Sequence, residues 1–434
     1  MHRPLPGTIP ATAPRTIEQL ARYLAAFTNY ERGGDLPTDR RLLGPERCRR
    51  LIARSGGAPN CPVIQVAGSK GKGSTVLAME RLLRGRGVST IATLSPHLER
   101  IEERLRIDGR DATSDEFVSA VATLHEGIHA IDRDHPEYRP TFFDLVIAAA
   151  ASAARTHEAE ALLLEVGLGG PLDSTSAVTA DVAVLTLVDL EHRAQLGDTV
   201  EEIAAEKARI ARDGVPFILE GSGEQSAGAI EAARAVATSL GAAVRVVEDD
   251  ERVPLGIPLH RRRALILACA ALEAAGFDRF EEMEIATADR QLRLPGRLEV
   301  LPGPPPLLLD GAHTIRSVAL FHRRLTEFRG DQPVTLLVGA MRDKEWRLAL
   351  APLIADAAIT WITTSTGGPR SADADELADE IARHERPVTP LPLGAAIERL
   401  RAADGTARAV TGSFHLAGAV RGLWREGSPT RESS

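Results

Sequence analysis

The chain has 434 residues, of which 44% are hydrophobic and 26% are charged. This length is enough for about two or three domains with cores of their own, and the composition excludes disordered and fibrous classes. The formal net charge of −8, from 52 Lys and Arg against 60 Asp and Glu, opposes general attraction to nucleic acid or to an anionic membrane. We therefore expect neither partner, and any anionic ligand must be held locally.

The sequence indicates neither a disulfide framework nor a membrane span. Cys48, Cys61 and Cys269 are far apart, lack C-x-x-C spacing and cannot all pair, so we expect small buried residues. The apolar stretches 142–154 and 264–272 are shorter than the about 20 residues of a membrane helix and predict buried helices. Residues 1–15 are Pro-rich without the apolar segment of an export signal, which predicts a flexible leader on a cytoplasmic enzyme.

Short apolar runs alternate with helical patterns over the first part of the chain. Helices are expected at 16–30 and 40–53, before a strand at 63–68 and a glycine loop that leads into a helix ending near Gly85. Further expected elements are strands at 88–94, 161–168, 181–188, 216–221 and 242–249 and helices at 114–131, 143–156, 200–211 and up to Val236. This alternation predicts a parallel sheet covered on both faces, in one α/β domain over 16–294.

A segment rich in Pro and Gly, LPGRLEVL at 294–301 followed by PGPPP, predicts a domain boundary. After it the alternation resumes, with strands expected at 306–313, 333–341, 358–365 and 408–415 and helices up to Phe328, at 346–357, at 372–384 and after 415. We expect a smaller Rossmann-like domain over 295–425 and a polar, mobile tail over 426–434.

The segment GSKGKGST, from Gly68 to Thr75, lies between the first predicted strand and its helix. Backbone N–H groups and a helix N-terminus in this position would cradle phosphate oxygens, and Lys72 would add a positive charge at the β- and γ-phosphates. The strict G-x-x-x-x-G-K-[ST] pattern is not met because Gly73 follows the lysine. On this segment alone, a glycine-rich turn without a ligand stays an alternative.

Other motifs accompany this loop along the chain: Tyr30-Glu31-Arg32, LSPHL at 94–98, ERLRIDG at 103–109, EVGLGG at 165–170, LGDTVEEIAAEKARI at 196–210, PGRLEV at 295–300, DGAH at 310–313, DK at 343–344, PR at 369–370 and VTGS at 410–413. In this order they resemble the Mur ligase superfamily, most closely the folylpolyglutamate synthase/dihydrofolate synthase family, over about residues 20–425. Only 67 residues precede Gly68, fewer than the N-terminal domain of the cell-wall Mur ligases would need. The resemblance therefore favours the folate branch.

This resemblance implies a P-loop-type, mostly parallel sheet domain followed by a smaller Rossmann-like α/β domain. It implies an ATP-dependent ligase that activates a folate or dihydropteroate carboxylate as an acyl phosphate, which the amino group of L-glutamate attacks. ATP and both substrates are anions, so the reaction needs lysines and Mg²⁺, with two ions expected. The family resemblance also implies a monomer.

In the first domain, the resemblance assigns ATP binding to Gly68, Ser69, Gly71, Lys72, Gly73 and Ser74. It assigns the first Mg²⁺ to Ser95 and Glu165, a second metal site to His192, and catalytic roles to Lys72, His192 and Lys207. Lys207 matches a family lysine that is often carbamylated, and a buried lysine with a lowered pKa can add carbon dioxide. Ile203, Ala204, Ile210 and Ala211 share its helical face and favour burial over an exposed lysine. Taken alone, Glu165 and His192 could equally be an ordinary strand-end charge and a satisfied polar side chain.

In the second domain, the resemblance assigns Arg297 to the ATP phosphates, Asp310 to the ribose or γ-phosphate, and His313 to the same loop. Each of the three has an alternative interpretation as a hinge or loop charge. Asp343 and Lys344 would support glutamate binding and are given no catalytic role.

Six positions depart from the family pattern: Lys70, Pro171, Ser176, Glu191, Ala264 and Thr314. Several replace an asparagine, whose amide both donates and accepts hydrogen bonds, so we expect ATP recognition to differ in detail. Lys70 and the arginines 261–263 could compensate with extra positive charge near the phosphates. Two other functions stay open: a nucleotide-binding regulatory homologue without ligation, and a ligase for another carboxylate.

Overall fold

The computed structural model describes residues 7–30, 44–303, 305–342, 345–367 and 370–426. Two compact units divide the chain: Met1–His97 with Glu102–Leu292, and Leu98–Ile101 with Arg293–Ser434. Each unit is built around a mostly parallel sheet, so the expected fold class is confirmed. The segment Leu98–Ile101, which follows the LSPH residues of a first-domain motif, is grouped with the second unit, and its sequence gave no sign of this.

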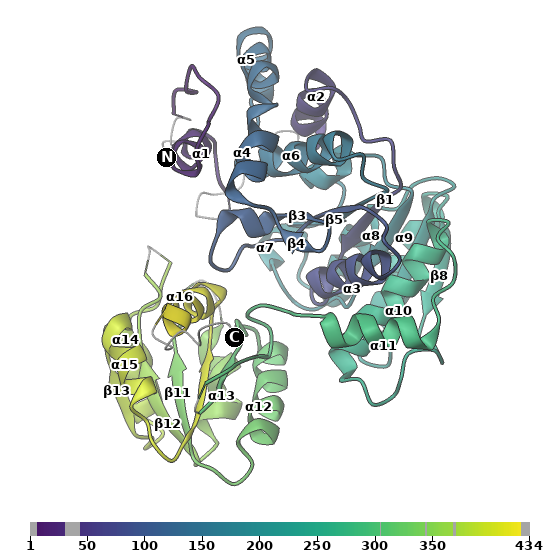
Figure 1. Ribbon diagram of the computed structural model, residues 1–434. Helices are drawn as coiled ribbons and strands as arrows, with labels where there is room; N and C mark the ends of the chain where they lie inside the picture. Colours follow the sequence, from purple (N-terminus) through teal and green to yellow (C-terminus); the bar gives the residue numbers. More distant parts are fainter. Residues whose placement is uncertain (1–6, 31–43, 304, 343–344, 368–369, 427–434) are drawn as a thin grey trace, which may run out of the picture. The chain divides into compact units, whose positions relative to one another are not determined.

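The first unit contains most of the helices and strands (Figure 1). In chain order they are α1 Ile17–Ala25, α2 Glu46–Arg54, β1 Val63–Ala67, α3 Lys72–Gly85, β2 Thr90–Thr93, the 3-10 helix η2 Ile101–Arg104, β3 Leu105–Ile107, β4 Arg110–Asp111, α4 Ser114–Ala122, α5 His125–Asp134, η3 Pro136–Tyr138, α6 Phe142–Thr156, β5 Ala161–Glu165, η4 Ser174–Ala177, β6 Val182–Leu185, α7 Arg193–Leu196, α8 Val200–Ala208, β7 Pro216–Glu220, α9 Ala227–Ser239, β8 Ala243–Val247, α10 Leu259–Ala274 and α11 Glu282–Gln291.

The sheet of this unit has the order β4-β3-β2-β5-β1-β6-β7-β8, with β1 between two parallel neighbours, β5 and β6. Strands β3 and β4, which were not predicted, are the antiparallel part of this mostly parallel sheet: β3 pairs with β2, and β4 pairs with β3. Asp108 and Gly109 connect them with φ of 51° and 85°. Two successive positive φ values match the twist of a two-residue hairpin, and this Asp-Gly signal was present in the sequence.

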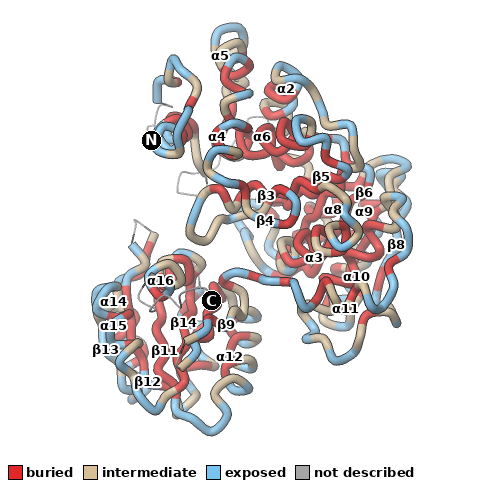
Figure 2. Tube along the Cα trace, viewed as in Figure 1, coloured by how far each residue is buried: buried red, intermediate tan, exposed pale blue. Residues whose placement is uncertain are grey.

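Helices cover both faces of this sheet, as expected. Alternate side chains of β1 point to opposite faces: Ile64 packs in one cluster with Leu265 of α10, and Ala67 packs in another with Ile203 of α8. Helices α3, α10 and α11 contact one another on the first of these faces. The central strands are buried, whereas most of β8 at the sheet edge is exposed or half-buried (Figure 2).

The helix expected over 114–131 is instead two helices, α4 and α5. The hydroxyl of Thr123 donates to the carbonyl of Ala120 at 2.7 Å and lies 2.9 Å from the Ser152 hydroxyl. A threonine that bonds its own helix in this way competes with the regular backbone pattern, which explains the break.

Three other expectations about the first unit can be compared with the structure. Cys48 and Cys269 are buried and Cys61 is half-buried; all three thiols are free. Of the residues expected as a leader, 7–15 are described, and they pack on this unit: Ile9 is buried and His129 Nε2 lies 3.1 Å from the carbonyl oxygen of Pro10. Within the described ranges, no helix combines the length and apolarity needed to span a membrane.

The second unit contains β9 Glu299–Leu301, β10 Leu307–Leu309, α12 Ile315–Arg329, β11 Val334–Val338, α13 Trp346–Ile354, β12 Ile359–Thr363, α14 Ala374–Ala382, β13 Val388–Pro390, α15 Leu393–Arg401, β14 Ala407–Thr411 and α16 Phe414–Glu426. The sheet order is β13-β12-β11-β14-β10-β9, and only β9 pairs antiparallel among these described strands. Leu308 and Leu309 point into separate clusters on its two faces. Helix α15 and strands β9 and β13 were not predicted.

Candidate active site

The glycine loop follows β1 at the carboxyl edge of the first sheet and leads directly into α3. Gly68 has φ of 144° and Gly71, the N-cap of α3, has φ of 93°. A Cβ atom on Gly68 would overlap the hydroxyl of Thr186, which follows β6. Both the backbone conformation and the close approach of Thr186 therefore require glycine at position 68.

The segment that follows β6 holds the loop from one side. The backbone N–H groups of Ser69 and Lys70 donate to the carbonyl oxygen of Leu187 at 2.8 and 3.0 Å. In return, the hydroxyl of Thr186 donates to the carbonyl oxygen of Lys70 at 2.8 Å, and the Ser69 hydroxyl donates to the carbonyl of Asp189 at 3.2 Å. These bonds fix the conformation of the loop.

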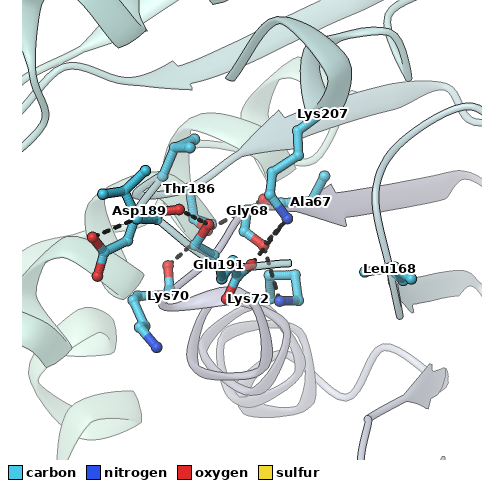
Figure 3. A network of polar contacts seen from close by, with 12 residues as sticks. Ala67, Gly68, Lys70, Lys72, Leu168, Thr186, Asp189, Glu191 and Lys207 are labelled. Atoms are coloured by element: carbon cyan, nitrogen blue, oxygen red, sulfur yellow. Dashed lines mark hydrogen bonds and ion pairs between the residues drawn. The ribbon is translucent and has the colours of Figure 1, made fainter. Parts of the chain in front are cut away.

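Two lysines donate to the same carbonyl of the loop (Figure 3). Lys72 Nζ lies 2.9 Å and Lys207 Nζ lies 3.0 Å from the oxygen of Gly68. Lys207 Nζ also lies 3.1 Å from Oε1 of Glu191. A positive cluster thus surrounds the start of α3, where helix N–H groups also favour anions.

Lys207 is 2% exposed, so the prediction that it is buried is confirmed. Burial lowers the pKa of Lys207 to about 8, and the Glu191 carboxylate opposes this effect. Burial would raise the pKa of Glu191, but the ammonium groups of Lys207, Lys72 and Lys70 hold it at about 2. The pair is therefore ionised near neutral pH.

A buried carboxylate lies on the other side of the loop. Glu165, at the end of β5, is 2% exposed, and its Oε2 accepts the N–H of Ser95 at 2.7 Å. A Cβ on Gly73 would lie 3.4 Å from that same Oε2, so the carboxylate faces the first turn of α3. The structure thus brings together Ser95, Glu165 and Gly73, three of the predicted site residues.

His192 is exposed at the start of the short helix α7, with φ of 50°. It directly follows Glu191, and it is close enough to contribute to the lowered pKa of that carboxylate. Among the described residues, no group of three or more His, Cys, Asp or Glu side chains is arranged to hold a metal ion.

The predicted residues of the second unit lie just before β9, for Arg297, and just after β10, for Asp310 and His313. The Arg297 guanidinium lies 4.6 Å from the centre of the Phe414 ring, and the His313 ring packs edge-on against the same phenylalanine at 6.0 Å. Asp310 accepts the N–H groups of Leu298 and Ala312, each at 2.6 Å. The three predicted residues therefore belong to one cluster, and Asp310 orders its backbone.

The arginines 261–263 lie where the sequence departs from the family pattern. Each of the arginines 261–263 faces a carboxylate: Arg261 faces Asp289, Arg262 faces Asp249, and Arg263 faces Glu224. These pairs offset part of their positive charge, and a role of that charge near the phosphates stays a prediction.

The replacements of asparagine show other local roles. Thr314 caps α12 by accepting the N–H of Ser317, and the Ser176 hydroxyl accepts from Gln65 Nε2 at 3.1 Å.

Sequence reasoning missed Thr186, Leu187 and the pairing of Glu191 with Lys207. Thr186 could have been found, because it follows a strand predicted to lie in the same parallel sheet as the loop, whose carboxyl ends share one edge. Glu31, Arg32, Asp343, Lys344 and Pro369, which were part of the motifs, lie outside the described residues.

Comparison with known proteins identifies the family. The model described as Mur ligase, glutamate ligase domain matches residues 296–414. The chain is 30% identical over 359 residues to the dihydrofolate synthase/folylpolyglutamate synthase of Escherichia coli, which covers 78% of this chain and 81% of that protein. It is 32% identical over 410 residues to a probable bifunctional folylpolyglutamate synthase/dihydropteroate synthase of Haloferax volcanii, covering 88% of this chain but 48% of that relative. The chain thus spans about half the length of this relative, and 45% of a protein of the same description from Halobacterium salinarum.

Solved structures agree with this result. The structure of E. coli FolC in complex with DHPP and ADP superimposes with a TM-score of 0.81 at 26% identity, covering 96% of this chain and 99% of that one. A bifunctional folylpolyglutamate synthase/dihydrofolate synthase from Yersinia pestis, complexed with AMPPNP and Mn ion, gives 0.79 at 26% identity, with 96% and 100% covered. The chain belongs to the folylpolyglutamate synthase/dihydrofolate synthase family of the Mur ligase superfamily.

Proposed function

We propose that this chain is an ATP-dependent ligase that joins L-glutamate to a carboxylate of folate or dihydropteroate through an acyl phosphate. One observation carries the proposal: two ammonium groups, of Lys72 and of Lys207, meet at the loop after β1, beside a helix N-terminus that faces the buried carboxylate of Glu165. Relatives supply the substrate class, since solved structures of family members hold DHPP with ADP, and Mn with AMPPNP and L-glutamate.

In this proposal the loop binds the triphosphate. The backbone N–H groups of Gly68, Gly71, Gly73 and Ser74 would donate to phosphate oxygens, as helix N-termini commonly do. Ser69, whose N–H already donates to the Leu187 carbonyl, would hold the loop in the binding conformation. Lys72 would exchange its contact with the Gly68 carbonyl for the β- and γ-phosphates. In the second unit we assign Arg297, Asp310 and His313 to ATP.

The residues beside the loop fit a Mg²⁺ ion. Glu165 offers carboxylate oxygens and Ser95 a hydroxyl, which are hard oxygen ligands of the kind this ion prefers, and Mg²⁺ bound to a nucleotide needs few protein ligands. When bound, it would neutralise charge as the γ-phosphate passes to the substrate carboxylate. Glu165 accepts the Ser95 N–H, which keeps that loop beside the phosphate site.

We assign a second metal site to His192 and Lys207. A pKa of about 8 gives Lys207 a sizeable neutral fraction near pH 7.5, as addition of carbon dioxide would require. Glu191 opposes that reaction because it stabilises the ammonium form. Its ion pair with Lys207 would have to open before the amine could be carbamylated.

Phosphate release tests the proposal. The full chain is incubated with ATP and Mg²⁺, with dihydropteroate or tetrahydrofolate, and with or without L-glutamate. Sustained release that needs both organic substrates supports ligation, whereas nucleotide binding without turnover supports a regulatory homologue. Phosphate release with another carboxylate, but with neither folate compound, supports a ligase for a different carboxylate substrate. Glu165→Gln should abolish turnover, and the matched control Glu160→Gln, an exposed residue just before the same strand, should not.

A further inference from the structure

A polar cavity lies in the first unit and shares no residue with the glycine loop. Its volume is about 260 Å³. The walls come from the start of α2, the loop after EVGLGG, the η4 turn and the residues that follow α8. This is enough space for a small ion with several oxygens and its hydration waters.

The cavity is strongly cationic. Arg49 of α2 and two arginines of the segment after α8, Arg209 and Arg212, line it, and no Asp or Glu is among its lining residues in the described part of the chain. Arg212 is fixed: its Nη2 donates to the carbonyl oxygens of Ser176 and Val178, each at 3.1 Å. The pKa of Arg212 is lowered by burial and by the neighbouring charge of Arg49, so the two guanidinium groups repel each other across this space.

Nearby carboxylates neutralise this charge only in part. Glu46 contacts Nη1 of Arg49 at 2.7 Å, and Glu206 lies 4.0 Å from Arg209. Both arginines are more than half exposed, so these pairs are weak. Because a guanidinium has five N–H donors, contact through one nitrogen leaves others for a second ligand.

The wall that carries Arg209 and Arg212 is packed tightly against the loop after EVGLGG. The backbone carbonyl of Glu206 approaches Gly170 so closely that a Cβ there would overlap it, and the carbonyl of Lys207 would be 3.2 Å away. Pro171 follows directly, and its ring adds rigidity to the cavity wall. The backbone of this wall is therefore rigid, and Arg212 is held by its two carbonyl bonds before a ligand arrives, which lowers the entropic cost of binding.

We propose that this cavity is a binding site for a phosphate dianion, either free or as the end group of a small phosphomonoester. Three guanidinium groups match a multiply charged ion with oxygens in several directions, whereas one guanidinium already satisfies a carboxylate through a pair of parallel bonds. This site is distinct from the nucleotide site and does not depend on the ligase activity.

Binding of orthophosphate to the full chain, measured by calorimetry with the nucleotide site filled by ADP, tests the proposal. Arg49→Gln and Arg209→Gln remove exposed side chains, and each should weaken phosphate binding about tenfold, as loss of a charged hydrogen-bond donor predicts. The control Arg54→Gln, on the same helix but paired with Asp134 outside the cavity, should leave affinity unchanged.

Several outcomes separate this site from its alternatives. If glycerol 3-phosphate binds as tightly as orthophosphate, the cavity is a phosphomonoester site. If glycerol 3-phosphate binds more weakly than orthophosphate, the cavity is a site for the free ion. Both results support the proposal. Equal phosphate affinity in Arg49→Gln, Arg209→Gln and the unaltered chain would overturn it. So would loss of binding in Lys72→Ala, which would place the ion in the phosphate loop, or glutarate that binds better than phosphate.

Discussion

Replacement of Gly68 by alanine tests whether the loop needs glycine for the reasons found in the structure. Gly68 has φ of 144°, and an added Cβ would overlap the Thr186 hydroxyl and lie 3.2 Å from the Thr186 backbone nitrogen. That hydroxyl cannot simply turn away, because it donates to the carbonyls of Lys70 and Ala67. The substitution therefore strains the backbone and also breaks contacts that hold the loop.

The two costs can be estimated separately. A side chain in a positive-φ conformation costs about 1–2 kcal/mol. Overpacking against a fixed neighbour adds about 1–3 kcal/mol. Gly68→Ala should thus lower the free energy of unfolding by about 2–5 kcal/mol, and ATP affinity should fall because the Gly68 carbonyl, which both lysines contact, moves.

Gly57→Ala is the matched control. Gly57 also has a positive φ, 90°, but nothing lies within 4 Å of its added Cβ, so only the strain cost applies. Urea unfolding and ATP binding are measured for both variants and for Gly68→Ala with Thr186→Ala, which removes the clashing hydroxyl. Partial recovery in the double variant is expected. If Gly68→Ala behaves like Gly57→Ala in both assays, the clash with Thr186 does not exist and the reasoning fails.

Three further predictions concern stability of the first unit. Glu80→Ala should cost about 3 kcal/mol, because it removes the carboxylate that lies 2.9 Å from the buried guanidinium of Arg106 and leaves it with the half-exposed Asp111 and the Gly109 carbonyl; urea unfolding that matches the unaltered chain would contradict this. Thr199→Ala should cost about 1 kcal/mol by removing the cap of α8, and Thr199→Ser should restore it in the same assay. Between about pH 8 and 10.5 the unfolded chain holds the Lys207 proton that the folded chain has released, so this group makes stability rise with pH by up to about 3 kcal/mol. Thermal unfolding is measured across that window for the unaltered chain and for Lys207→Met. The stability difference between the two should rise with pH, and a difference that does not change with pH would be inconsistent with the lowered pKa.

Apolar periodicity predicted most of the parallel strands, because buried parallel strands are continuous apolar runs that the sequence displays directly. The same pattern failed at short, half-exposed elements such as β13, where Val388 is half-buried and the residues after it are exposed. It also failed at the break in the helix over 114–131, which depends on where the Thr123 hydroxyl finds an acceptor. Side-chain hydrogen bonds of this kind are set by tertiary neighbours and leave no periodic signal.

The site residues also differ in how far the sequence could predict them. The glycine loop and Glu165 could be predicted because each stands at the end of an apolar strand, where parallel sheets gather polar groups. The Lys207–Glu191 pair could not, because its members come from different segments and meet only when α8 packs on the sheet.

The charge balance of this cluster would favour a polyanion at the glycine loop, although the chain as a whole is acidic. Lys72 and Lys207 donate to one carbonyl oxygen, and they reach it from positions 4 and 139 residues away along the chain. A neutral carbonyl cannot cancel two positive charges, and Glu191 pairs directly with Lys207. Repulsion between the lysines contributes to the lowered pKa of Lys207, so positive charge in this cluster is not fully compensated. An anion at the start of α3 would relieve that repulsion, and a formal net charge of −8 elsewhere has little effect at such short range.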